Sequence, residues 1–161
     1  MRLVELEGGW VVLRPLSVRG WQLLQQGESI VCLSLHIAEW SEKEPVSVGA
    51  VQRLRADVHD RLLYELRQTV EPVFSMDKDL LRRYIRMFLK GIRTPQDATH
   101  AFLVDNYFWL AQSMCDHKGN IVTLPEKGGW LDQPLDWAFV LAMYRLEFVE
   151  YLAAQQRSVR R

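Results

Sequence analysis

The chain has 161 residues, of which 48% are hydrophobic and 25% charged, and its 20 basic and 20 acidic side chains leave no net charge. This length suits one domain with a substantial core, and the composition excludes intrinsic disorder. The neutral total excludes a nucleic-acid binder that is basic throughout, although not one with a local basic face. Two cysteines, Cys32 and Cys115, are too few for a disulfide framework and suit a reducing compartment. Glu5 and Glu7 interrupt the apolar start, so no signal peptide is expected.

The first residues predict a β-hairpin. Residues 3–7 and 10–14 are apolar and β-prone, and Gly8-Gly9 between them can adopt the positive φ angles of a tight turn. Pro15 ends the second strand because it has no N–H for the ladder. Since an isolated hairpin is only marginally stable in water, we expect this one to lie against helices or to pair with another chain.

The residues after Pro15 predict about five helices. Ser17 caps a short helix that Gly27 ends. Residues 28–40 carry both a helical stripe and a strand-like alternation, and the longer helical stripe favours a helix. The other predicted helices cover residues 47–70, 76–90, 95–114 and 132–156, with Ser47, Ser75 and Thr94 as N-caps and Gly91 as a left-handed helix end.

The fold class predicted from these elements is mainly α, in a single helical domain over residues 1–161. Residues 1–15 form its hairpin and residues 157–161 a frayed basic tail. Residues 137–144 are apolar on every side of the helix, so we expect them to be buried all round. This stretch is too short to span a membrane. The predicted core consists of Leu54, Val58, Leu62, Leu66, Leu81, Ile85, Phe88, Phe102, Phe108, Trp109, Phe139, Val140, Met143 and Leu146.

No motif points to catalysis or to a cofactor. The sequence has no glycine-rich nucleotide loop, no metalloprotease or nucleophile-elbow motif and no paired cysteines at metal spacing. Cys115-Asp116-His117 offers possible ligands in one short segment, which favours a structural interpretation over a metal site. Glu147 and Glu150 lie one turn apart, and we expect them to be solvated or to contact basic residues. We therefore predict no catalytic residue, no metal and no cofactor.

A cluster of cations predicts a binding surface on the helix over residues 76–90. Arg82, Arg83, Arg86, Lys90 and Arg93 lie within twelve residues with no acid among them, and Arg82, Arg86 and Lys90 share one helix face. Like charges four residues apart destabilise an isolated helix slightly, so we expect the cluster to meet something anionic. Another part of this chain or another protein is favoured over a phosphate backbone because the net charge is zero.

Tryptophan is unusually frequent, with six residues in a small chain. Indole buries a large area and keeps a hydrogen-bond donor at its edge, which favours it at interfaces. Trp109 and Trp137 are assigned to the core. Trp10, Trp40 and Trp130 lie at element ends or in loops and are assigned to a partner-binding surface.

Two phrases of the sequence resemble small proteins that assist tail or baseplate assembly in tailed bacteriophages. The first is Val12-Leu-Arg-Pro-Leu-Ser17, where a strand leads into a helix. The second runs from Trp109 to Ile121, where a helix ends in a small residue followed by Asp-x-x-Gly and a short apolar strand. The resemblance covers about a fifth of the chain and carries no functional residue across.

The resemblance implies a non-enzymatic protein that binds other phage tail or baseplate proteins, or a second copy of itself. It would act as an assembly factor in the host cytoplasm or as a tail-tip component of the virion, with no membrane partner. Two alternatives remain open: a nucleic-acid-associated regulator that uses the basic residues 82–93, and a small helical enzyme whose site is scattered in the sequence.

Overall fold

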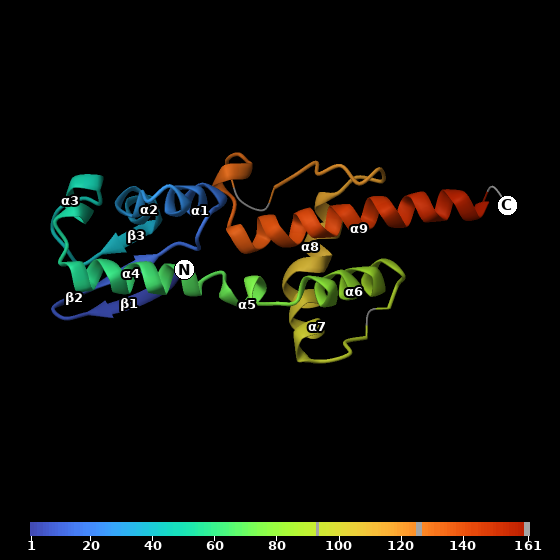
Figure 1. The fold of residues 1–161 in the computed structure, drawn as a ribbon, viewed down its shortest axis with the longest axis horizontal. Coiled ribbons are helices and arrows are strands. Elements are labelled where there is room, and N and C mark those ends of the chain that lie inside the picture. Colours follow the sequence, from blue (N-terminus) through green and yellow to red (C-terminus); the bar gives the residue numbers. More distant parts are fainter. Residues whose placement is uncertain (93, 125–126, 160–161) are drawn as a thin grey trace. The chain divides into compact units, whose positions relative to one another are not determined.

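The computed structural model describes residues 1–92, 94–124 and 127–159, without the side chains of Glu71, Pro72 and Val159. The fold is mainly α with an N-terminal antiparallel hairpin and a third strand, as the sequence predicts (Figure 1). Except for the last one, the helices are shorter than predicted, and the described residues contain more of them.

The chain folds into two compact units. Unit 1 comprises Met1–Phe74 with Gly128–Leu135, and unit 2 comprises Ser75–Lys127 with Asp136–Arg161. A single domain remains a prediction, because one domain can contain two compact units.

The sheet of unit 1 has the order β1 (Arg2–Leu6), β2 (Gly9–Leu13), β3 (Ile37–Trp40), and both pairings are antiparallel. Leu6 pairs with Gly9, so the hairpin turn is the two-residue Glu7-Gly8. Gly8 takes a φ of 88°, which glycine adopts without steric cost. The predicted hairpin is therefore confirmed, with its turn one residue earlier than Gly8-Gly9.

Residues 28–40 form a helix and a strand, so the prediction of one helix is wrong for its last turn. Helix α2 (Ser29–His36) ends where β3 begins, and Ile37 pairs with Leu13 of β2. The edge of β2 offers ladder hydrogen bonds to a segment whose apolar residues also alternate, and this pairing takes precedence over the helical stripe.

Helices cover one face of the sheet. The prediction that the hairpin lies against helices is confirmed, because α4 (Ala56–Gln68) contacts β1 and α2 contacts β3. The core of unit 1 lies between sheet and helices, and its buried members include Val4, Val11, Leu13, Leu33, Ile37, Val51, Leu62 and Leu66. Alternate residues of β1 and β2, among them Leu3 and Trp10, point to the other face and are exposed.

The predicted helix over residues 47–70 is broken. It consists of α3 (Val48–Gln52), which Ser47 caps, and α4, with an extended residue, Arg55 (ψ 147°), between them. The Arg55 guanidinium donates two hydrogen bonds to Asp57, of 3.0 and 2.8 Å. The break leaves Leu54 and Val58, which were predicted in the core, only half-buried.

A strap from late in the sequence closes unit 1. It contains the 3₁₀ turn η2 (Trp130–Asp132) and reaches α1 (Val18–Gln25), whose N-cap is Ser17 as predicted. Val18 N–H donates to Gln133 O at 3.1 Å, and Leu135 N–H donates to Leu16 O at 2.7 Å. The short helix α5 (Glu71–Phe74) ends the first segment of the unit.

A buried histidine fixes α1 on α2. His36 Nε2 accepts hydrogen bonds from the backbone N–H and the hydroxyl of Ser17, both at 3.0 Å, and Nδ1–H donates to Cys32 O at 2.7 Å. These partners require the neutral imidazole. Gly20 of α1 lies so close that a Cβ there would be 2.2 Å from His36 Cε1.

Unit 2 contains α6 (Lys78–Leu89), α7 (Ala98–Leu103), the π-helix η1 (Val104–Phe108), α8 (Trp109–Met114) and most of α9 (Leu135–Val159). Every residue from 137 to 144 is buried or half-buried, as predicted. The fully buried part of the predicted core is confirmed at Leu81, Ile85, Phe88, Phe108, Val140 and Met143, and Phe139 is half-buried.

Three predicted core residues of unit 2 are instead exposed: Phe102, Trp109 and Leu146. The helix predicted over residues 95–114 is interrupted by η1, which changes the helical phase between Phe102 and Trp109. The ring of Trp109 contacts that of Phe88 edge-to-face at a centroid distance of 5.1 Å.

Several helix ends of unit 2 differ from the predicted ones. Asp77 and Asp97 are the N-caps of α6 and α7, in place of Ser75 and Thr94. The predicted frayed tail is wrong for residues 157–159, which continue α9, whereas residues 160–161 lie outside the described part. None of the described helices is long and apolar enough to cross a membrane.

The close approach of α1 to His36 predicts an unusual effect of alanine. Gly20→Ala should lower the free energy of unfolding by about 1–3 kcal/mol, because the new Cβ overlaps His36 and lies 2.9 Å from Leu16 Cδ1. Gly49→Ala in α3, where the nearest atom is 3.7 Å away, should raise it by about 0.5–1 kcal/mol. Urea denaturation of both variants measures this, and a stabilised Gly20→Ala chain would contradict the packing.

Lowering the pH should reduce the free energy of unfolding, because His36 is buried in its neutral form. Burial lowers the pKa of His36, and the same cause lowers the pKa of His100. Below about pH 6.5 these two histidines are therefore protonated in the unfolded chain but remain neutral in the folded chain. The free energy of unfolding should consequently fall as the pH drops through this value. Urea denaturation at about pH 7.5 and about pH 5.5 measures the loss, which should be smaller for His36→Gln. Equal stability of the wild type at both pH values would disprove the assignment.

Candidate partner-binding surfaces

The predicted basic cluster begins on α6, whose ends are set locally. The Asp77 carboxylate accepts the Asp79 N–H at 2.8 Å and starts the helix. Gly91, with a φ of 82°, ends it as predicted, and Ile92 N–H donates back to Met87 O at 3.0 Å. Arg93 lies outside the described residues.

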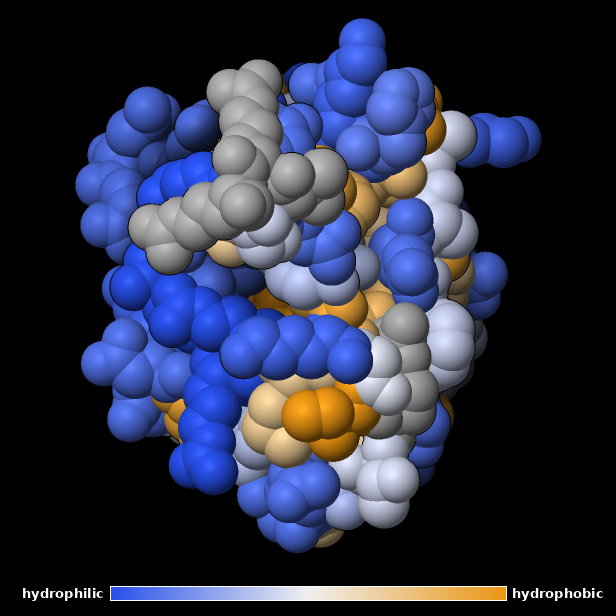
Figure 2. All heavy atoms as spheres, turned by 90° about the vertical axis from the view of Figure 1, so that its right-hand side faces the viewer, coloured by the Kyte–Doolittle hydropathy of each residue, from blue (hydrophilic) through white to orange (hydrophobic). Residues whose placement is uncertain are grey.

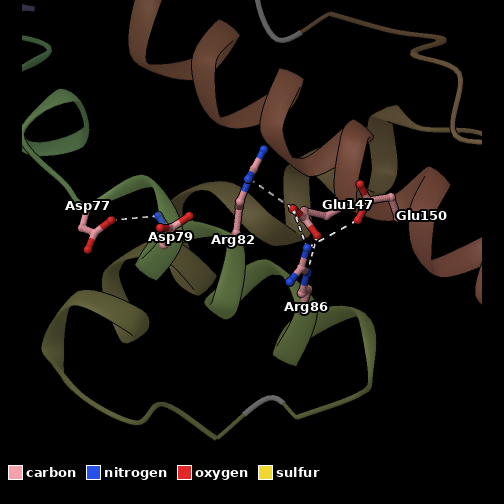
Figure 3. Close-up of polar contacts among 6 residues, drawn as sticks. All are labelled: Asp77, Asp79, Arg82, Arg86, Glu147 and Glu150. Carbon is pink, nitrogen blue, oxygen red and sulfur yellow. Dashed lines mark hydrogen bonds and ion pairs between the residues drawn. The ribbon is translucent and has the colours of Figure 1, made fainter.

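Two of the cations on α6 contact α9. Glu147 lies between Arg82 and Arg86 in Figure 3, with ion pairs of 3.4 Å to Arg82 Nε and 2.5 Å to Arg86 Nε. Arg86 also pairs with Glu150 at 3.4 Å. The hydrogen bond to Glu147 raises the pKa of the Arg86 guanidinium. The expected contact of Glu147 and Glu150 with basic residues is thus present for both.

Glu147 is the buried member of this cluster. Its side chain is 3% exposed, whereas those of Arg82 and Arg86 are 46% and 55% exposed. A carboxylate removed from water in this way requires compensating charge and hydrogen bonds, which the two guanidinium groups provide. The burial of this acid could not be inferred from its spacing to Glu150.

Two other cations of α6 remain on the surface. Arg83 and Lys90 are exposed, and no ion pair to either is found among the described residues. They line a hollow of about 430 Å³ together with Asp79, Arg82, Arg86, Met87 and Ile92. Figure 2 shows one face of the molecule, on which hydrophilic side chains surround smaller hydrophobic areas.

The structure places Trp10 and Trp40 at a second hollow, in unit 1. This hollow of about 500 Å³ is lined by the hairpin turn, by Arg53 and Arg55 of the segment that joins α3 to α4, and by Arg61 of α4. Trp40 is half-buried and its Nε1–H donates to Glu44 O at 2.8 Å, whereas Trp10 is 39% exposed. Trp130 is exposed on η2 and does not line either hollow. A role of these tryptophans in binding stays a prediction.

One polar cluster of unit 2 was not predicted from the sequence. Tyr84 donates a short hydrogen bond to Asp97, which also accepts the His100 N–H at 2.8 Å. The rings of Tyr84 and His100 are stacked at a centroid distance of 4.5 Å. The three-residue step from Asp97 to His100 could have indicated the cap, but nothing in the sequence indicates Tyr84. The cluster anchors the start of α7.

Asp116 and the two cysteines have structural explanations. No group of three potential metal ligands occurs in the described ranges. Asp116 accepts the N–H groups of Lys118 and Asn120 and a side-chain bond from Asn120, and these bonds lower its pKa to about 2. Both cysteines are free, and burial raises the pKa of Cys32 to about 11, which disfavours the reactive thiolate.

Comparisons of the chain with protein-family models, with curated proteins and with solved structures found no match.

Because Glu147 is buried and Glu150 is exposed, we expect removal of their charges to lower the free energy of unfolding by different amounts. Glu147→Gln should lower the free energy of unfolding by about 1–3 kcal/mol, because Arg82 and Arg86 lose their shared counter-charge. Glu150→Gln, at a side chain that is 70% exposed, should cost about 0.5 kcal/mol or less. Urea denaturation of both variants distinguishes them, and equal costs would show that burial of Glu147 adds nothing.

Proposed function

We propose that this chain is a non-enzymatic protein that binds other proteins, and that it acts in the assembly of a bacteriophage tail or baseplate. The observation that carries the proposal is the apolar outer face of the sheet. Leu3 is 60% exposed and Trp10 39% exposed, and Val12 lies directly opposite Leu3 in the ladder. Large apolar side chains gathered on a regular surface favour a protein partner.

The geometry of this face suits a partner of matching shape. Its residues stand on paired strands, so their positions are set by the register of β1 and β2 and by the core beneath. A partner that covers Leu3 and Trp10 gains buried apolar area without the cost of ordering a loop. Glu5, which is opposite Trp10, and Glu39, which is opposite Val12, add charge around the apolar centre.

The setting of tail assembly is supported by the two phrases that resemble phage tail and baseplate assembly proteins. The first phrase, over residues 12–17, contains the end of β2 and the N-cap of α1. The second contains α8 and the Asp116 turn. In this proposal the chain works in the host cytoplasm as an assembly factor, or remains in the virion tail.

Replacing the apolar side chains of the outer sheet face should weaken capture of the partner. We expect Leu3→Ser/Trp10→Ser to reduce the affinity for an identified tail or baseplate protein about tenfold or more, since both residues point away from the core. The partner is first identified by affinity purification from phage-producing cells. The affinity is then measured with the two purified proteins, and light scattering gives the stoichiometry.

A matched control is available in the same unit. Leu35→Ser/Tyr64→Ser removes two exposed apolar side chains on α2 and α4 and should leave the affinity unchanged. If the control weakens binding as much as the sheet variant, the outer face is not the site. If the wild-type chain captures no tail or baseplate protein, the proposed function is wrong.

A further inference from the structure

The cations of the basic cluster differ in how they meet α9: Glu147 binds Arg82 and Arg86, whereas Lys90 forms no ion pair among the described residues and borders a smaller hollow that Glu147 and Glu150 also line. Arg83, Met87 and Lys90 recur at steps of four and three residues and so form one stripe. Arg82 and Arg86 lie on the neighbouring face, where Glu147 holds them. The internal ion pairs thus separate Arg82 and Arg86, which have acidic partners, from Arg83 and Lys90, for which no acidic partner is found among the described residues.

The hollow beside this stripe is lined by cations and by two apolar side chains, those of Met87 and Ile92. Met87 is half-buried, and Ile92 is 43% exposed where the chain turns back after Gly91. Asp79 is the acid among the lining residues, at the N-terminal end of the stripe. Asp79, Glu147 and Glu150 offset three of the four cations Arg82, Arg83, Arg86 and Lys90, so one positive charge remains in excess. Arg83 and Lys90 are the two of these cations without an ion pair among the described residues.

We infer that this hollow binds an acidic segment of a partner protein, whose carboxylates meet Arg83 and Lys90 while an apolar side chain covers Met87 and Ile92. The inference rests on the proposed function, because it names the chemistry of a protein partner. Asp79 repels carboxylates at its end, so the acidic residues of the segment lie toward Lys90.

Charge complementarity favours a protein segment over nucleic acid. Non-specific binding to a phosphate backbone requires many neutralised phosphates, because each contributes little at physiological salt. The stripe offers two unpaired cations, and the chain as a whole carries no net charge. An apolar floor adds affinity for a leucine-like side chain but none for a phosphate.

The test uses a fluorescently labelled peptide of about ten residues, glutamates with two leucines, and a second peptide in which glutamine replaces glutamate. We expect the folded full-length chain to bind the acidic peptide and to lose about tenfold in affinity with added salt or with Arg83→Glu/Lys90→Glu. The control Lys43→Glu/Lys118→Glu changes the net charge equally at exposed residues outside the hollow and should bind as the wild type does. Urea denaturation confirms that both variants fold, since none of the four side chains is buried.

Several outcomes would overturn the inference. These are no binding of the acidic peptide by the wild type, equal loss in both variants, and equal binding of the glutamine peptide. Tighter binding of a DNA duplex of about 15 base pairs, lost in Arg83→Glu/Lys90→Glu, would assign the hollow to nucleic acid instead.

The experiment separates this inference from the proposed function. If Arg83→Glu/Lys90→Glu binds an identified tail protein as tightly as the wild type, the inference about the hollow fails and the proposed function stands. If the wild type binds the acidic peptide through these two residues but captures no tail or baseplate protein, the proposed function fails and the recognition chemistry stands.

Discussion

The surface of unit 2 depends on a single buried carboxylate, that of Glu147. It fixes the orientation of Arg82 and Arg86 on α6 and connects that helix to α9. The basic cluster therefore contains two kinds of cation: Arg82 and Arg86, which are paired with α9, and Arg83 and Lys90, which have no ion pair among the described residues. The first two connect α6 to α9, and we assign the other two to a partner. Reversing Arg82 and Arg86 together with Lys90 would therefore alter packing and surface charge at once.

Local signals in the sequence predict those parts of the fold that local chemistry determines. The two-residue turn at Gly8, the Ser17 cap and the Gly91 helix end each depend on one or two residues, and each is present. Residues 37–40 form a strand because β2 offers them hydrogen bonds, which is information from a distant segment. The break at Arg55 and the π-helix before Trp109 likewise interrupt patterns that look continuous in one dimension.

The candidate surfaces could be predicted only in part, for a related reason. The composition identified the cations of α6 and the exposed indole of Trp10. The composition could not show which of these cations have an acidic partner, because Glu147, the partner of Arg86, is 61 residues away in the sequence. It could not find the contact of Tyr84 with Asp97 either, because that contact depends on how α6 packs against the start of α7.

The strap at residues 128–135 has a consequence for the order in which the protein can form on the ribosome. Unit 1 contains the first 74 residues, but the backbone bonds to Leu16 and Val18 come from Leu135 and Gln133. The sheet and the first helices are therefore synthesised before most of unit 2, and they lack the bonds from residues 133 and 135 until that synthesis is complete. Nascent chains that stall before residue 128 lack these backbone bonds to Leu16 and Val18, so unit 1 is incomplete in them.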